Sequence, residues 1–323
     1  MSDDAHADHE SAARAGAAPR PALTVRLASL AEPREPSPDE MARGPTVARM
    51  LLGARLRRLR EARGVSRAEA GRLIRGSDSK ISRMETGRTG FKERDLVDLL
   101  DLYGVTDEAE RAVLLALAEQ AGRPGWWQPY HEIIPQWYET YLGLEQSAEM
   151  IRCHESHVIP ELLQTPDYAR AALALTHGGE PAETVERRVE LRLRRARILE
   201  RSRPPRLWAM IDEAALRRPF GGAAVMRDQL RRLIEASRLP HVTVQVMPFR
   251  AGGYPGVGAP ITLLRQPEAE LPDVVYLARP NGAEYVDKPE DVDAFRHVLN
   301  QMATQAAPAA ETPRILRAVI DET

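Results

Sequence analysis

Polar and charged side chains gather between Ser77 and Lys92, in a segment with helical periodicity. Ile81 and Met84 are apolar at helical spacing, so in a helix that begins after Ser77 they turn inward together. The side chains left on the outer face are Asp78, Ser79, Ser82 and Arg83. They offer hydrogen-bond donors and acceptors without a nucleophile and base arranged to act together. This face therefore suits recognition rather than catalysis.

The same part of the chain concentrates positive charge. Residues 44–104 carry fourteen Lys and Arg against eight Asp and Glu, a net charge of +6, whereas the whole chain has a net charge of −2. Residues 1–43 and 105–323 carry −3 and −5. Charge of one sign gathered in a small segment is typical of a module that binds nucleic acid. A solvated, arginine-rich helical surface is the alternative.

The elements that must position these residues are short helices. Leu52, Leu56 and Leu59 recur at helical spacing and predict a first helix that Gly64 ends. Ser66 and Glu69 then form a capping-box pattern that begins a second helix, which runs to about Ile74. It contains Gly71, which is tolerated inside a helix where another helix must pass very close.

A tight turn at Arg75 and Gly76 follows, Ser77 caps the third helix, and Gly87 ends it. Two short helices joined by a glycine-containing turn, the second with a polar outer face, predict a helix-turn-helix. A plain helical bundle is the alternative.

This pattern resembles the phage-repressor-like helix-turn-helix family over Thr46–Tyr103. Arg75 and Gly76 depart from the family, which more often has Gly and then an aliphatic residue in the turn. The resemblance implies that Asp78, Ser79, Ser82 and Arg83 contact base edges in the major groove of double-stranded DNA. It also implies that a basic residue of the first helix, here Arg60, forms a structural ion pair with Glu85, and that the protein binds DNA as a homodimer.

Four further basic residues are candidates for phosphate contacts, which supply affinity without sequence information. They are Arg67, Lys80, Arg88 and Lys92. Each could instead be an ordinary solvated charge.

The remainder of the chain predicts a tail, a linker and a second domain. Residues 1–43 are interrupted by proline and are expected to be disordered. The helix-turn-helix domain is expected at 44–105, a connecting helix and linker at 106–125, and a regulatory domain at 126–320. This domain is expected to be α+β or α/β: helical first, with Thr165 capping a helix, and then with a small mixed sheet. The expected strands are Leu207–Ile211, Val242–Met247, Ile261–Leu264 and Val274–Leu277, and the expected last helix is Pro289–Gln305.

The segment from Ile159 to Ala171 looks like the signature of a domain of unknown function that follows a helix-turn-helix in many actinomycete regulators. Ile211–Arg217 and Val244–Phe249 resemble it further, and the resemblance spans about Trp126–Ile320. It implies an antitoxin-like transcriptional regulator, often encoded beside a small partner protein. It names no ligand.

Other chemistry is poorly supported by the sequence. Cys153, the only cysteine, stands near His154 and His157, but no second cluster completes a metal site. Asp212 and Glu213 are adjacent and point apart, so they make a poor acid–base pair. The loop from Gly252 to Gly258 lacks the lysine of a phosphate-binding loop, and is either a strand connection or the rim of a pocket. We therefore expect no metal, no cofactor and no enzymatic activity.

Aromatic and basic side chains in the second domain have two interpretations each. The aromatic residues Trp126, Trp127, Trp137 and Tyr138 are expected in the core or an interface rather than in a small-molecule cage. An arginine-rich helix is expected at about Ala182–Arg201, with its arginines on a solvated face or in a second DNA contact. These arginines are Arg187, Arg188, Arg192, Arg194, Arg195 and Arg197.

Taken together, the sequence predicts a DNA-binding transcriptional regulator with a partner- or ligand-responsive second domain. The alternatives are an enzyme tethered to DNA and a protein-interaction module that has lost DNA binding. No run approaches the roughly 18 apolar residues of a membrane span, and the first residues lack the pattern of a signal peptide. The expected location is therefore the cytoplasm, at the nucleoid.

Overall fold

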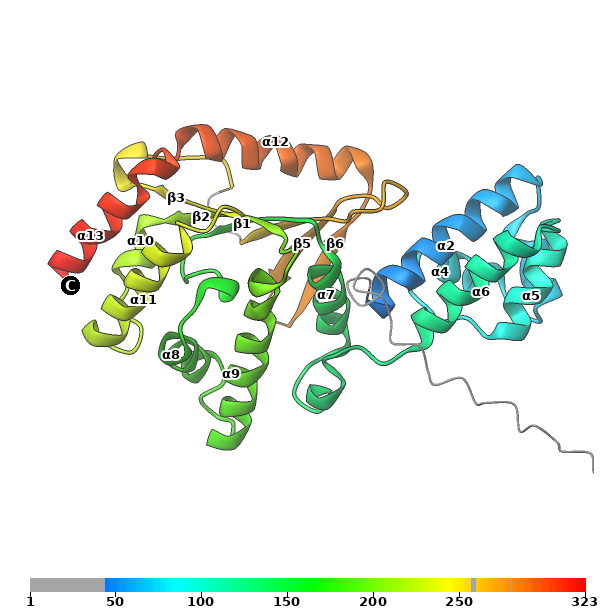
Figure 1. Ribbon diagram of the computed structural model, residues 1–323, viewed down its shortest axis with the longest axis horizontal. Coiled ribbons are helices and arrows are strands. Elements are labelled where there is room, and N and C mark those ends of the chain that lie inside the picture. The colour runs from blue at the N-terminus through cyan, green and yellow to red at the C-terminus, as the bar shows by residue number, and fades with distance from the viewer. Residues whose placement is uncertain (1–43, 257–259, 280) are drawn as a thin grey trace, which may run out of the picture. The chain divides into compact units, whose positions relative to one another are not determined.

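The computed structural model describes residues 44–256, 260–279 and 281–323. The tail predicted at residues 1–43 lies outside the described residues. The elements α2 to α6 form a helical bundle, and the elements from α7 onward form an α/β domain (Figure 1). The two are described in turn.

The bundle contains the predicted helix-turn-helix. Its helices are α2 (Pro45–Ala62), α3 (Arg67–Leu73), α4 (Asp78–Glu85), α5 (Glu93–Leu102) and α6 (Glu108–Gly122). The Ser66 hydroxyl accepts a hydrogen bond from the Glu69 amide at 3.1 Å, and the Ser77 hydroxyl accepts one from the Lys80 amide at 3.2 Å. Both predicted N-caps are therefore present. Helix α6 packs along α2, so it belongs to the bundle rather than to a linker.

Two glycines allow the helices of the bundle to approach closely. A Cβ atom on Gly71 would lie 2.9 Å from the carbonyl carbon of Ser77, in the turn that leads into α4. A Cβ atom on Gly53 in α2 would lie 2.4 Å from the carbonyl oxygen of Met84. Any larger residue at either position would push α4 away, because backbone atoms cannot move aside as a flexible side chain does. The role predicted for Gly71 is confirmed, and Gly53 does the same for α2.

Arg60 and Glu85 join α2 to α4 inside the bundle. The Arg60 guanidinium donates to the Glu85 carboxylate through Nε at 2.5 Å and through Nη2 at 3.0 Å. It also donates to the Val65 carbonyl at 3.0 Å. Both side chains are about nine-tenths buried, with 10% and 6% exposed. The fork of the guanidinium thus fixes the position of α4 against α2 and the chain that follows α2.

The α/β domain is built on one mixed sheet among the described residues. Its strands are β1 (Met150–Glu155), β2 (Arg206–Asp212), β3 (Val242–Met247), β4 (Ile261–Arg265), β5 (Val274–Arg279) and β6 (Gly282–Val286). Their order is β3-β2-β1-β4-β5-β6. β1, β2 and β3 are parallel, whereas β4, β5 and β6 follow as antiparallel neighbours. The predicted mixed sheet is therefore confirmed.

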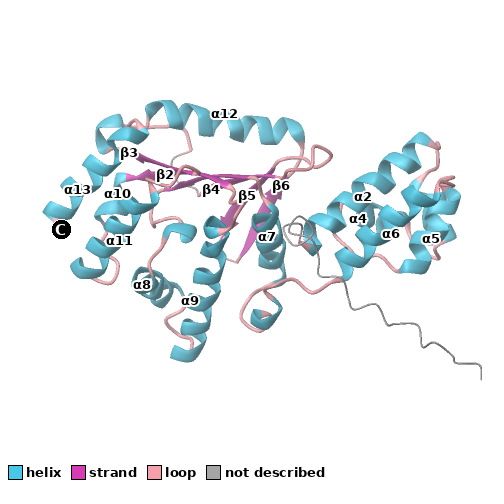
Figure 2. Cartoon of the chain, in the orientation of Figure 1, coloured by secondary structure: helices cyan, strands magenta, loops and turns pink. Residues whose placement is uncertain are grey.

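Helices cover both faces of the sheet (Figure 2). Helix α12 (Pro289–Gln305) lies on one face, over a core that includes Met210, Leu263 and Leu299. The other face carries α7 (Gln136–Ser147), α8 (Pro166–Thr176), α9 (Ala182–Ala196), α10 (Glu213–Arg217) and α11 (Ala223–Ala236). Helix α8 begins at Thr165 as expected, with its hydroxyl accepting from the Tyr168 amide. The parallel strands need these helical crossovers, because neighbouring parallel strands cannot be joined by a tight turn.

Three expectations for this domain were wrong. The first part of the domain was expected to be mostly helical, with no strand before Leu207, but Met150–Glu155 is β1, which pairs with β2 and β4 near the middle of the sheet. Strand β6 was not expected. The last helix is α13 (Thr312–Glu322), which packs against α11 and β3, and not Pro289–Gln305.

Two arginines of α9, Arg192 and Arg195, turn into the domain, whereas Arg194 is exposed as expected for a solvated face. Arg195 has only 2% of its side chain exposed, and its Nε and Nη2 atoms each donate to the Glu145 carboxylate at 2.8 Å. Its Nη1 atom contacts Glu161 and Tyr138. Arg192 donates to Glu161 at 2.6 Å. Neither a solvated face nor a second DNA contact describes Arg192 and Arg195.

The titration of Glu161 reflects this pairing. Burial alone would raise the pKa of Glu161, but Arg192 and Arg195 outweigh it and hold the pKa at about 2. Glu161 is therefore ionised, and the carboxylate joins α9 to the short helix η2 (Glu161–Leu163).

The pKa of Glu155, at the end of β1, is shifted in the opposite direction. This residue lines a small cavity of about 110 Å³ beneath α9. Burial and the nearby Glu161 raise the pKa of Glu155 to about 8, against the smaller opposing effect of Arg192. Its ordinary pKa in an unfolded chain is about 4.3, so the native protein holds a proton that the unfolded chain has lost.

We predict that Glu85→Ala destabilises the bundle by about 3–5 kcal/mol, because it leaves the buried Arg60 charge unpaired. The matched control is Glu61→Ala, since Glu61 also contacts Arg60 but has 50% of its side chain exposed. That change should cost less than about 1 kcal/mol. Thermal denaturation of the full chain, with hydrogen exchange at α2 and α4, measures both. Equal losses for the two variants would contradict the structural role of Glu85.

We predict a second effect, of pH, at Glu155. In the folded protein Glu155 keeps its proton at pH values where the unfolded chain has lost it. Its contribution to the free energy of unfolding is therefore fully present at acid pH, and stability is lost as the pH rises from about 5 to about 8. Glu155→Gln should therefore raise the melting temperature relative to the parent protein at pH 8 but not at pH 5. The control is Glu149→Gln, at an exposed carboxylate just before β1. A melting-temperature difference independent of pH would overturn the assignment.

Candidate nucleic-acid interface

The outer face of α4 carries the four residues predicted to contact bases. Ile81, Met84 and Glu85 are buried in the bundle. On the opposite side Asp78, Ser79 and Arg83 are exposed, and Ser82 is half-buried. The periodicity that separates these two sets comes directly from the helix, because residues three and four apart share a face. The structure thus brings the four predicted residues together.

Arg83 has the chemistry for direct base recognition. Within the part of the chain that the structure describes, its guanidinium makes no ion pair or hydrogen bond. A free planar guanidinium on an exposed helix can donate two parallel hydrogen bonds to guanine O6 and N7. Asp78 is less free, because its carboxylate lies 3.5 Å from Nε of Arg67 on α3.

The four predicted phosphate contacts divide into two classes. Lys80 is half-buried, and its ammonium group donates to Asp95 on α5 at 2.6 Å. Arg67 is exposed but faces Asp78. Arg88 and Lys92 are exposed and have no side-chain partner among the described residues. Arg88 and Lys92 are therefore available to phosphates as they stand, whereas Lys80 holds α4 to α5.

The sequence interpretation missed Arg72 and Arg75, two exposed cations at the end of α3 and in the turn. Arg75 has φ of 52°, a left-handed conformation that glycine adopts without the steric cost of a Cβ atom. This explains why the related pattern more often has glycine here. The clustering of positive charge in residues 44–104 was the signal that included both residues.

Residues considered for other chemistry have structural roles. Cys153 is buried, and burial raises the pKa of its thiol above the usual range, so the thiolate needed for nucleophilic attack is disfavoured. Asp212 caps α10 by accepting from the Ala214 amide at 2.8 Å, and it also accepts from the Tyr254 hydroxyl at 2.5 Å. Glu213 accepts from the Phe249 amide at 2.9 Å. The loop from Gly252 to Gly258 lies partly outside the described residues.

Within the described ranges, no group of three or more His, Cys, Asp or Glu side chains is placed to hold a metal ion. No described helix is both long and apolar enough to cross a bilayer.

Comparison with known proteins agrees with this division. Residues 51–114 match a helix-turn-helix domain, which indicates DNA binding and transcriptional regulation. Residues 138–318 match a domain of unknown function, DUF5753. No curated protein and no solved structure matches the chain. The chain therefore belongs to the family defined by the domain of unknown function DUF5753, here preceded by a helix-turn-helix domain.

Proposed function

We propose that this protein is a sequence-specific, antitoxin-like transcriptional regulator that reads double-stranded DNA with α4. The observation that carries the proposal is the exposed guanidinium of Arg83, unpaired among the described residues, on a helix whose other face is anchored in the bundle. Ser79 and Ser82 share that outer face and add hydroxyl donors and acceptors. Arg88 and Lys92 supply contacts to phosphates, which fix the register of α4 but do not distinguish sequences.

A rigid position for α4 is what makes base recognition selective. The Arg60–Glu85 pair and the close approach at Gly53 both hold α4 against α2. A bidentate arginine–guanine contact depends on the direction of the guanidinium, so a loosely held helix would lose discrimination before it lost affinity.

We further propose that the α/β domain responds to a ligand or to a small partner protein encoded nearby, and that the protein is not an enzyme. The enzyme hypothesis needs free acids or an activated nucleophile. Asp212 and Glu213, its nearest candidates, are engaged in helix capping and in hydrogen bonds to the backbone. The third hypothesis, a module without DNA binding, gives no reason for the unpaired Arg83 on a segment of net charge +6.

DNA binding is predicted to depend on salt and on Arg83. If about 4–6 phosphates are neutralised, the logarithm of the binding constant should fall against the logarithm of salt concentration with a slope of about −4 to −5. Arg83→Ala should cost about 1–3 kcal/mol on the selected site and little on random DNA. Lys92→Ala should weaken both equally and reduce the slope by about 1.

The site is first obtained by selection from random DNA, and mobility-shift titrations with the full chain then measure each variant. Loss of affinity for selected and random DNA alike in Arg83→Ala would contradict base recognition. Failure to select any sequence would contradict the proposal itself.

The protein is also predicted to bind DNA as a homodimer. One short recognition helix reaches only a few base pairs, which discriminates weakly against the many competing sites of a genome. Two copies of α4 across a two-fold axis, about 34 Å or a multiple apart, solve this problem. Sedimentation of the full chain and footprinting on the selected site should show a dimer protecting two half-sites. A monomer protecting one asymmetric half-site would contradict the prediction.

A further inference from the structure

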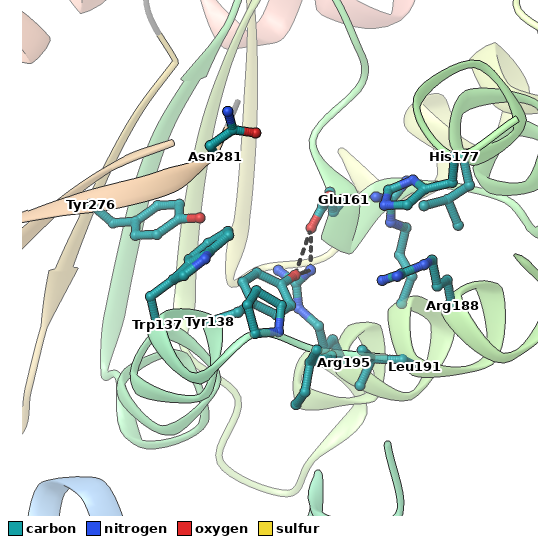
Figure 3. Close-up of a pocket in the computed structure, with 13 residues that line it drawn as sticks. Trp137, Tyr138, Glu161, His177, Arg188, Leu191, Arg195, Tyr276 and Asn281 are labelled. Carbon is teal, nitrogen blue, oxygen red and sulfur yellow. Dashed lines mark hydrogen bonds and ion pairs between the residues drawn. The ribbon is translucent and has the colours of Figure 1, made fainter. Parts of the chain in front are cut away.

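The α/β domain contains a cavity of about 570 Å³ between the start of α7, the end of α8, α9 and β5. Its principal polar and aromatic lining residues are Trp137, Tyr138, Glu161, His177, Arg192 and Tyr276 (Figure 3). This volume lies within the range of about 300–1,000 Å³ that is typical of small-molecule sites. Trp137 and Tyr138 pack against the hydrophobic core, as expected, and they also line this cavity.

The walls of the cavity suit a planar ring. Trp137 and Tyr138 stand edge to face with centroids 5.6 Å apart, and Tyr276 on β5 lies beside Trp137 (Figure 3). Leu173 and Leu191 add aliphatic surface from α8 and α9. Aromatic rings stack on such surfaces with an offset or edge-on geometry.

The charged groups of the cavity are already paired. Arg192 donates to Glu161 at 2.6 Å, and to Gln164 at 3.0 Å. Arg188 donates to both oxygens of Glu180, at 2.7 and 2.8 Å. The third guanidinium, that of Arg195, holds Glu145 in the same bidentate way.

The guanidinium groups and their carboxylate partners therefore balance. A charged ligand would add an unbalanced charge to a partly buried site whose own charges are already matched. An uncharged ligand avoids this cost.

The Tyr276 hydroxyl of the cavity makes no hydrogen bond within the part of the chain that the structure describes. Tyr276 is 8% exposed. Figure 3 shows this hydroxyl directed into the cavity. Burial raises the pKa of Tyr276 far above neutrality, so the group is an uncharged donor. The hydroxyl is therefore available to donate to or accept from a molecule that enters the cavity.

His177 provides a second polar contact at the opposite side of the cavity from Tyr276 (Figure 3). Its Nδ1 atom lies 2.8 Å from the Thr176 hydroxyl, which leaves Nε2 for a ligand. Burial and the neighbouring Arg188 lower the pKa of His177, so the imidazole is neutral at pH 7. A ligand is thus met by neutral hydrogen-bonding groups at both ends.

We propose that this cavity binds an uncharged, planar aromatic molecule with oxygen substituents, stacked on Trp137 and Tyr138 and hydrogen-bonded to Tyr276. The inference gives a chemical class to the ligand-responsive role proposed for the α/β domain and rests on that role for its biological meaning. The binding itself does not depend on DNA.

The test uses three probes on the full chain, each a naphthalene ring with a hydroxyl, carboxylate or aminomethyl group at the same position. Isothermal titration calorimetry at pH 7 should give a Kd of about 1 mM or below for naphthol, as expected for a ligand of this size. The carboxylate and ammonium probes should bind at least about tenfold more weakly, because each carries an unpaired charge into the cavity.

Tyr276→Phe should weaken naphthol binding by about three- to tenfold, the usual effect of one hydrogen bond. The matched control is Tyr103→Phe in the helical bundle, a buried tyrosine whose hydroxyl likewise has no side-chain partner among the described residues, and this change should leave naphthol binding unaltered. Circular dichroism and thermal melting confirm that both variants are folded.

Each other outcome overturns the proposal. Preference for the carboxylate or the ammonium probe would show that the cavity is not selective for uncharged ligands. Binding that is insensitive to Tyr276→Phe would place the ligand elsewhere, and no binding of any probe would remove the cavity as a ligand site. A mobility-shift assay on the same samples keeps the two proposals apart, since naphthol binding without DNA binding would contradict only the regulator.

Discussion

The ion pair between Arg60 and Glu85 is the interaction on which the DNA-binding half of the molecule depends. It lies inside a small helical bundle, where it joins the 18-residue helix α2 to the eight-residue helix α4. The pair connects α2, α4 and the Val65 carbonyl, so it fixes α4 at the point where the chain turns. A buried ion pair adds little to the net free energy of folding. Its larger effect is to favour the one geometry in which both charges are paired.

Buried ion pairs also hold the helices of the α/β domain together, but here they line a cavity. Arg195 joins α9 to α7 through Glu145 and to η2 through Glu161. Because carboxylates pair with Arg192 and Arg195, the two guanidinium groups line a cavity without making it a cationic surface. The ion pairs that stabilise the packing of α9 also leave the cavity without net charge. An uncharged ligand therefore enters it at the lowest free-energy cost.

The two halves thus use arginine in opposite ways. On α4, Arg83 is exposed and unpaired among the described residues, which leaves its donors for another molecule. On α9, Arg192 and Arg195 donate hydrogen bonds to carboxylates of the protein itself. Composition cannot separate these cases, because a paired and an unpaired arginine look alike in a sequence. What separates them is whether a carboxylate lies within reach in the folded chain.

The sequence by itself determined the local features of this protein. Ser66 and Ser77 cap helices, Gly71 permits a close approach, and Ile81 with Met84 selects the outer face of α4, since each of these depends on neighbours a few residues away. The contact between Arg60 and Glu85 was expected only through a family resemblance. Tertiary structure alone decided that Met150–Glu155 is a strand, because helices cover both faces of the sheet and β1 therefore lacks the simple alternation of a half-exposed strand. It also decided that Arg195 meets Glu145, since partners fifty residues apart are brought together by packing and leave no periodic signal in the chain.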